Sequence, residues 1–233
     1  VHRDHCIHRA LLKNINGWKI AYSIDLGYCE VDSDVRANTE AAVQTFRELG
    51  CTVEEIDLGW SMKVLSAAMS HLGHLFGGSM AKHLALHRHE MTNYARALAE
   101  FGRTTTAEEF LAAMAYADEM YSTLGPALEK YNVLICPTNA LPAVPADHDS
   151  TKEPVVINGV EVDPMIGWVM TYPFNVMSRC PVMSVPSGHA ANGVPTGLQI
   201  VGRTFDDVSV FRAAAAFERA RPWLDTPERR PNL

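Results

Sequence analysis

The chain has 233 residues, of which 47% are hydrophobic and 20% charged, and its formal net charge is −7. This length can bury a substantial core, and the composition excludes a disordered, collagenous or coiled-coil protein. The acidic balance, without any block of Lys and Arg, argues against a nucleic-acid partner. The longest apolar runs fall well short of the roughly 20 residues that cross a bilayer, so we expect no membrane association.

The cysteines predict neither a disulfide framework nor a zinc knuckle, because they are scattered, odd in number and lack Cys-x-x-Cys spacing. They are Cys6, Cys29, Cys51, Cys136 and Cys180. This usage favours a reducing cytoplasm, and no signal peptide is recognisable. No Walker loop, Gly-x-Gly-x-x-Gly or Gly-x-Ser-x-Gly motif is present, so we expect no cofactor. The chain begins at Val1 instead of Met, which is typical of a processed, truncated or cloned fragment.

The first predicted unit is a β-α-β arrangement over residues 15–59, after an N-terminal extension at 1–14. Its elements are a buried strand at 18–23, a helix at 34–49 and an alternating strand at 51–58. Asp32 and Ser33 are good N-terminal caps for the helix. The unit predicts a pair of parallel strands in an α/β sheet.

Residues 60–130 are predicted to be helical, and residues 131–233 to complete the sheet. The helical region lacks strand signals and favours two or three helices, one beginning at a capping box of Thr106 and Glu109. The later region is predicted to contain a strand at 132–136, a Pro-rich loop at 137–153, a hairpin at 155–162, strands at 181–185 and 197–201, and a helix at 206–219. Asn158-Gly159 is the expected two-residue turn of the hairpin.

Four stretches together resemble the amidase signature family. They are GWKIAYSIDLGY with the helix and strand after it, YNVLICPTNALPAVP (131–145), TYPFNVMSRCPVMSVPSG (171–188) and GVPTGLQIVGRTFDD (193–207). The resemblance covers nearly the whole chain, is thinnest at 1–14 and 60–105, and corresponds to the C-terminal half of a family member. It implies an α/β fold that is half of the amidase-signature fold, with a mixed β-sheet flanked by helices.

The resemblance also implies a hydrolase of C–N amide bonds that uses a nucleophilic serine, a bridging serine and a lysine. In the family these groups lie in the front half. This chain has no Ser-Ser pair, and its nearest likeness is Gly77-Gly78-Ser79 followed by Met80. We therefore expect no catalytic residue here. The implied partners are an N-terminal half, as a separate polypeptide or a processed chain, a small-molecule amide, and a second copy in a dimer of the completed enzyme.

Loops are also expected at 136–138, 168–175 and 179–181, and Pro173 is expected to shape a turn in the second of them. Four residues on these loops are candidates for substrate binding: Trp168, Thr138, Tyr172 and Arg179. Where the glutamine-hydrolysing branch of the family is expected to have an aspartate for the substrate's ammonium, this chain has Trp168. A tryptophan favours a neutral aromatic or aliphatic amide, although it could equally belong to the core. Arg179 could bind a carboxylate or imide oxygen, or pair with a structural acid. Asn175, Ser184 and Ser187 are interpreted as structural.

Three alternatives are weaker. The first is a non-catalytic α/β binding or subunit-contact module that retains an amidase half-fold. The second is an independent serine–lysine hydrolase using Ser79 and Lys82, although the companion motifs of such enzymes are missing. The third is a metal site, for which the candidate groups are His2, His5 and His8 with Asp4 and Cys6, and His83 and His87 with Glu90. No His-Glu-x-x-His motif supports it, and no metal is expected.

Overall fold

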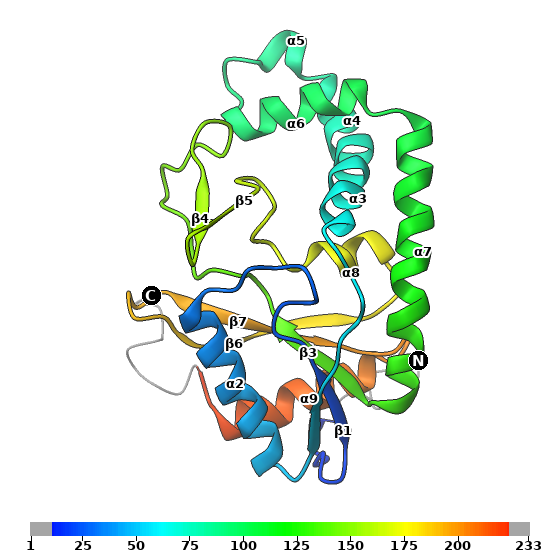
Figure 1. The fold of residues 1–233 in the computed structure, drawn as a ribbon, viewed down its shortest axis with the longest axis vertical. Coiled ribbons are helices and arrows are strands. Elements are labelled where there is room, and N and C mark those ends of the chain that lie inside the picture. Colours follow the sequence, from blue (N-terminus) through cyan, green and yellow to red (C-terminus); the bar gives the residue numbers. More distant parts are fainter. Residues whose placement is uncertain (1–10, 224–233) are drawn as a thin grey trace.

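A five-stranded mixed sheet organises the lower part of the molecule in Figure 1. The computed structural model describes residues 11–223, and its sheet has the order β2-β1-β3-β7-β6. The strands are β1 (Lys19–Tyr22), β2 (Thr52–Glu55), β3 (Val133–Pro137), β6 (Val182–His189) and β7 (Pro195–Val201). β1 runs parallel to β2 and β3, whereas β7 runs antiparallel to β3 and β6. The predicted parallel pair and mixed sheet are confirmed.

Successive residues of β3 point to opposite faces of the sheet, and all of them are buried. Val133 and Ile135 pack with the core beneath α2 (Ser33–Glu48) and α9 (Asp207–Ala220), where the rings of Phe46 and Phe217 stack at 5.2 Å. Leu134 and Cys136 pack into the larger core on the other face. Helices cover both faces, which explains why β3 is continuously apolar and does not alternate.

The larger core lies beneath α3 (Lys63–Leu72), α7 (Ala107–Lys130) and α8 (Tyr172–Met177). The capping box predicted at the start of α7 is confirmed. The backbone N–H of Glu109 donates to the Thr106 hydroxyl at 3.1 Å, and the N–H of Thr106 donates to the Glu109 carboxylate at 2.7 Å. α7 then runs along one whole side of the molecule, from the upper helices down to the sheet (Figure 1).

The helical region is more divided than predicted. α3 continues through a π-helical turn, η1 (Gly73–Gly77), into α4 (Gly78–Ala81), and then follow α5 (Leu84–His87) and α6 (Asn93–Thr104). The expectation of two or three helices was therefore wrong in number. A wide π turn leaves no mark in an apolar pattern that suits an α-helix equally well.

A separate hairpin of β4 (Val155–Ile157) and β5 (Val160–Val162) lies beside the upper helices. Its turn residues Asn158 and Gly159 have φ values of 50° and 83°, as the predicted turn requires. By contrast, the expected loop at 168–175 was wrong in part, because α8 begins at Tyr172. Pro173 suggested a turn, but a proline is tolerated in the first turn of a helix, where its missing N–H has no intrahelical partner.

The N-terminal extension lies mostly outside the described residues, and with it the histidines at 2, 5 and 8. Within residues 11–223, none of the helices is both long enough and apolar enough to cross a bilayer.

Candidate functional site

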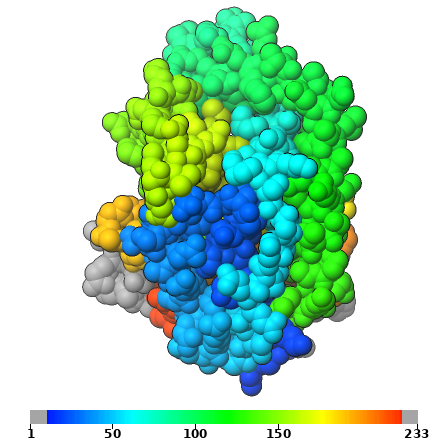
Figure 2. All heavy atoms as spheres, viewed as in Figure 1, coloured from blue at the N-terminus to red at the C-terminus, as the bar shows by residue number. Residues whose placement is uncertain are grey.

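An apolar hollow of about 530 Å³ opens between the upper helices and the loops above the sheet. It is lined by Leu72, Phe76, Tyr94, Leu98, Val144, His148, Ser150, Pro164, Met165, Ile166, Trp168, Val169 and Tyr172. These residues come from α3, η1, α6, the loop at 138–154 and the segment at 163–172. Figure 2 shows the yellow-green loop and hairpin region packed directly against the cyan α3 region on the viewed face. The volume is in the range typical of small-molecule sites.

The segment that carries Trp168 is pinned to the end of β3. The backbone N–H of Ala140 donates to the Trp168 carbonyl at 2.8 Å, and the N–H of Met170 donates to the Thr138 carbonyl at 3.2 Å. Asp163 turns the start of the segment by accepting the backbone N–H groups of Met165 and Ile166, each at 2.9 Å. The backbone that carries the indole is therefore held in the wall of the hollow by hydrogen bonds on both sides.

Gln199 of β7 supports this wall from beneath. Its side-chain amide donates to the carbonyls of Pro137 at 2.9 Å and Met170 at 3.1 Å, and the residue is 1% exposed. Sequence reasoning missed it, although one amide-bearing residue within the apolar run Leu198–Val201 was a signal. A buried polar side chain in a central strand must find partners, and such partners are commonly backbone groups of adjacent loops.

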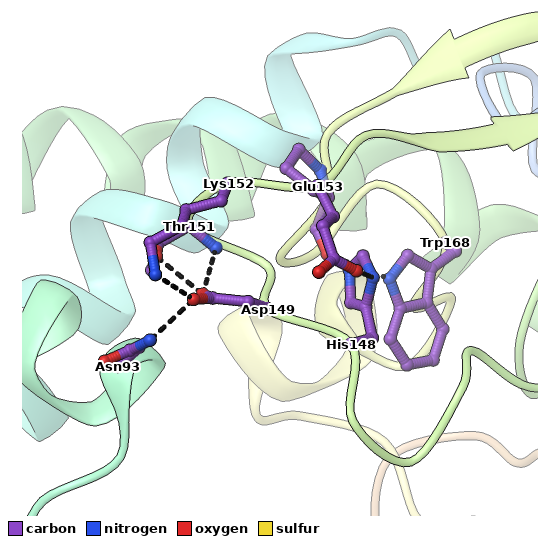
Figure 3. Close-up of polar contacts among 8 residues, drawn as sticks. Asn93, His148, Asp149, Thr151, Lys152, Glu153 and Trp168 are labelled. Atoms are coloured by element: carbon purple, nitrogen blue, oxygen red, sulfur yellow. Dashed lines mark hydrogen bonds and ion pairs between the residues drawn. The ribbon is translucent and has the colours of Figure 1, made fainter.

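The loop at 138–154 forms another wall and is fastened to α6 through Asp149 (Figure 3). The Asp149 carboxylate accepts the side-chain amide of Asn93 at 2.5 Å and the Thr151 hydroxyl at 2.6 Å, and it pairs with the Lys152 ammonium at 2.9 Å. The bond from Thr151, followed by that from Lys152, lowers the pKa of Asp149 below its ordinary range. The ionised form is therefore the one that holds the loop.

Replacing Asp149 with asparagine is expected to lower the free energy of unfolding at neutral pH, and the difference from wild type should shrink as the pH falls below about 4. A carboxyl whose folded pKa is lowered stabilises the protein above its unfolded pKa, and this contribution is lost as the pH falls through the folded pKa. Urea unfolding at several pH values measures it. Asp147→Asn, at an exposed neighbour, should stay within about 0.5 kcal/mol of wild type. A difference for Asp149→Asn that is constant with pH would contradict the prediction.

Beside Asp149, His148 faces the opposite way, toward Glu153 and Trp168 (Figure 3). Its Nδ1 lies 3.3 Å from a Glu153 carboxylate oxygen, and its side chain is 8% exposed. Its Nε2 is buried and has no hydrogen-bond partner. This histidine was also missed in the sequence, where it sits in a polar stretch without a recognisable motif.

The structure brings together two of the four predicted site residues. Trp168 and Tyr172 line the hollow, whereas Thr138 and Arg179 do not. The Thr138 hydroxyl bonds to that of Ser184 at 2.9 Å. Arg179 pairs with Asp118 and lies over the ring of Tyr121 at 5.3 Å, and both partners are on α7. These contacts match the structural alternative considered for Arg179.

Three further side chains that could act as nucleophiles, Ser79, Ser187 and Cys29, are either hydrogen-bonded or held in the protonated form. The Ser79 hydroxyl donates to the Phe76 carbonyl at 2.9 Å, and the Ser187 hydroxyl bonds to that of Thr196 at 2.8 Å. Burial raises the pKa of the Cys29 thiol to about 12, which makes it a poor nucleophile near neutral pH. In residues 11–223, no group of three or more His, Cys, Asp or Glu side chains is arranged to hold a metal ion.

Comparison with known proteins gives a consistent result. The Amidase family model matches residues 5–211. An acylamidase of Rhodococcus erythropolis is 29% identical over 91% of this chain and 44% of the relative, and a glutamyl-tRNA(Gln) amidotransferase subunit from Latilactobacillus sakei subsp. sakei (strain 23K) is 30% identical over 91% and 46%. The crystal structure of a bacterial aryl acylamidase of the amidase signature family superposes with a TM-score of 0.80 at 28% identity, covering 93% of this chain and 46% of that one. The chain thus spans about half the length of these relatives.

Proposed function

The chain belongs to the amidase signature family, and we propose that it is the back half of an enzyme that hydrolyses the C–N bond of uncharged, largely apolar amides. The nucleophilic serine, bridging serine and lysine would come from the front half, on a separate polypeptide or in a preceding segment. The serine oxygen would attack the amide carbon, the amine would leave with a proton, and water would then release the acid. This chain would supply part of the sheet and part of the substrate wall.

The apolar hollow carries the substrate proposal. Trp168 and Tyr172 contribute aromatic surface to it, and its lining in the described chain includes no Asp, Glu, Lys or Arg. A charged group would lose its hydration there without gaining a counter-ion, so the lining favours a neutral aryl or alkyl group. The similarity to an acylamidase and an aryl acylamidase supports the same substrate class.

The sheet edges support the half-enzyme proposal. Among the described residues, β2 and β6 are the outer strands, and each pairs on one side alone. β6 is eight residues long, and Val182 at its start is 38% exposed. A long open edge with an exposed apolar residue favours association with further strands. We propose that strands of the front half continue the sheet at the β6 edge. We also propose that the completed enzyme is a cytoplasmic protein that can pair as a dimer.

Replacing Trp168 with aspartate in the complete enzyme is expected to raise KM for a neutral anilide about tenfold or more, because a carboxylate would be placed against an apolar ring. Steady-state kinetics with an anilide measures this effect. Trp168→Phe keeps an aromatic wall and should change KM by less than about threefold.

Two results would contradict the proposal. An unchanged KM in Trp168→Asp would remove Trp168 from the substrate wall. Amide hydrolysis by the isolated 233-residue chain would refute the assignment of the catalytic groups to a front half.

A further inference from the structure

His148 carries an unpaired nitrogen in the wall of the hollow. Its side chain is 8% exposed, and its Nε2 is buried without a hydrogen-bond partner, although the ring lines the hollow. Buried polar atoms in proteins nearly always have a partner, because leaving one unpaired costs stability. An exception in the wall of a ligand-sized hollow has a simple explanation if the ligand supplies the partner.

Glu153 determines what kind of partner fits. Its carboxylate oxygen lies 3.3 Å from Nδ1 of His148 and can accept a proton from that nitrogen but cannot donate one. In a neutral imidazole one nitrogen carries the proton and the other is a bare acceptor. Glu153 therefore favours the tautomer with the proton on Nδ1, which leaves Nε2 as a hydrogen-bond acceptor.

We propose that Nε2 of His148 accepts a hydrogen bond from the occupant of the hollow, and that this occupant is an uncharged, mostly aromatic molecule bearing one donor group, a phenolic O–H or an amide N–H. The inference rests on the proposed function only in taking the hollow as the substrate site. His148 would then select among neutral ligands, and Glu153 would act as a positioning residue that holds the tautomer.

Nε2 of His148 is buried, so a ligand reaches it only if a neighbouring side chain moves. Trp168 also lines the hollow, and its ring N–H makes a long bond of 3.4 Å to the Pro164 carbonyl, which is a weak restraint on the ring. In this proposal the indole moves aside and then packs against the ligand's ring, which contributes to binding.

Calorimetry on the complete enzyme tests the proposal with two probes, 4-methylphenol and its O-methyl ether, 4-methylanisole. They have nearly the same shape, but the ether lacks the donor. At one fixed, mildly alkaline pH, wild type is expected to bind the phenol about tenfold more tightly than the ether. His148→Phe keeps an aromatic ring without the acceptor and should abolish this preference.

A matched control is available on the surface. Nδ1 of His87 also lies 3.3 Å from a carboxylate oxygen, that of Glu90, but its side chain is 51% exposed and does not line the hollow. His87→Phe should leave the preference for the phenol unchanged. Nitrogen NMR of the wild type gives a readout that does not depend on a folded variant. The His148 ring should be protonated at Nδ1, and the phenol but not the ether should shift its Nε2 signal.

The results separate this inference from the proposed function. A phenol preference that persists in His148→Phe, an equal affinity of wild type for both probes, or a ring protonated at Nε2 would overturn it even if amides are hydrolysed. A preference that depends on His148 in a protein that hydrolyses no amide would support the inference and refute the proposed function.

Discussion

Replacing Gly102 with alanine is expected to lower the free energy of unfolding by about 2–3 kcal/mol. Gly102 lies on α6 where this helix crosses η1, and a methyl group there would lie 2.5 Å from the Gly73 carbonyl oxygen and closer still to backbone atoms of Gly77 and Gly78. Backbone atoms cannot move aside as a flexible side chain can, so the two helices would have to separate. Urea unfolding monitored by circular dichroism measures the loss.

Gly78 provides the control within the same crossing. A methyl group there would meet nothing closer than 3.9 Å, so Gly78→Ala is expected to stabilise the helix by about 0.5–1 kcal/mol. The separation caused by Gly102→Ala should also weaken ligand binding, since η1 and α6 supply Phe76, Tyr94 and Leu98 to the hollow. Equal stability of the two variants would show that the helices do not approach this closely.

Replacing Gln199 with leucine is expected to cost about 2–4 kcal/mol of stability. Leucine has similar bulk but cannot donate, so the buried carbonyls of Pro137 and Met170 would each lose a hydrogen bond. These carbonyls belong to the end of β3 and to the segment that carries Trp168. The variant should therefore also bind ligands in the hollow more weakly.

The control for Gln199 is Gln44, which is exposed on α2 and bonds to Glu48 at 3.3 Å. Gln44→Leu should change stability by no more than about 0.5 kcal/mol. A second variant, Gln199→Met, tests whether any loss comes from the shape of leucine, because methionine adapts to irregular space. Wild-type stability in both Gln199 variants would show that the two carbonyls find other partners.

Local signals in the sequence predicted much of the fold. Asp32 begins α2, Thr106 and Glu109 form the capping box of α7, and Asn158-Gly159 makes the turn between β4 and β5. Each of these signals involves residues within three or four positions of one another, so it can be recognised from the sequence alone. The antiparallel pairing of β7 with β3 joins distant segments, and the π turn at Gly73–Gly77 has the same apolar pattern as an α-helix, so no local pattern encoded either feature.

The site was predicted less completely. Trp168 and Tyr172 were proposed because the family resemblance drew attention to their segment, and both line the hollow, while their role in substrate binding stays a prediction. Thr138 and Arg179 lie on loops near the sheet but face other partners, Ser184 and Asp118. His148 was not predicted, because the feature that distinguishes it is its unpaired Nε2 atom, and only the folded structure shows that this atom has no partner.

The order of strands in the sheet also has a consequence for how the chain is made. β1 pairs with β3, which follows more than 100 residues later, and β3 needs β7 on its other edge. During synthesis the pair β1–β2 and its helix can form early, and the helices between them and β3 depend on local contacts that form fast. Until residue 201 has left the ribosome, however, one edge of the wholly apolar β3 stays unpaired. This open edge is prone to aggregation, and β7, which follows β3 in the sequence, is the strand that protects it.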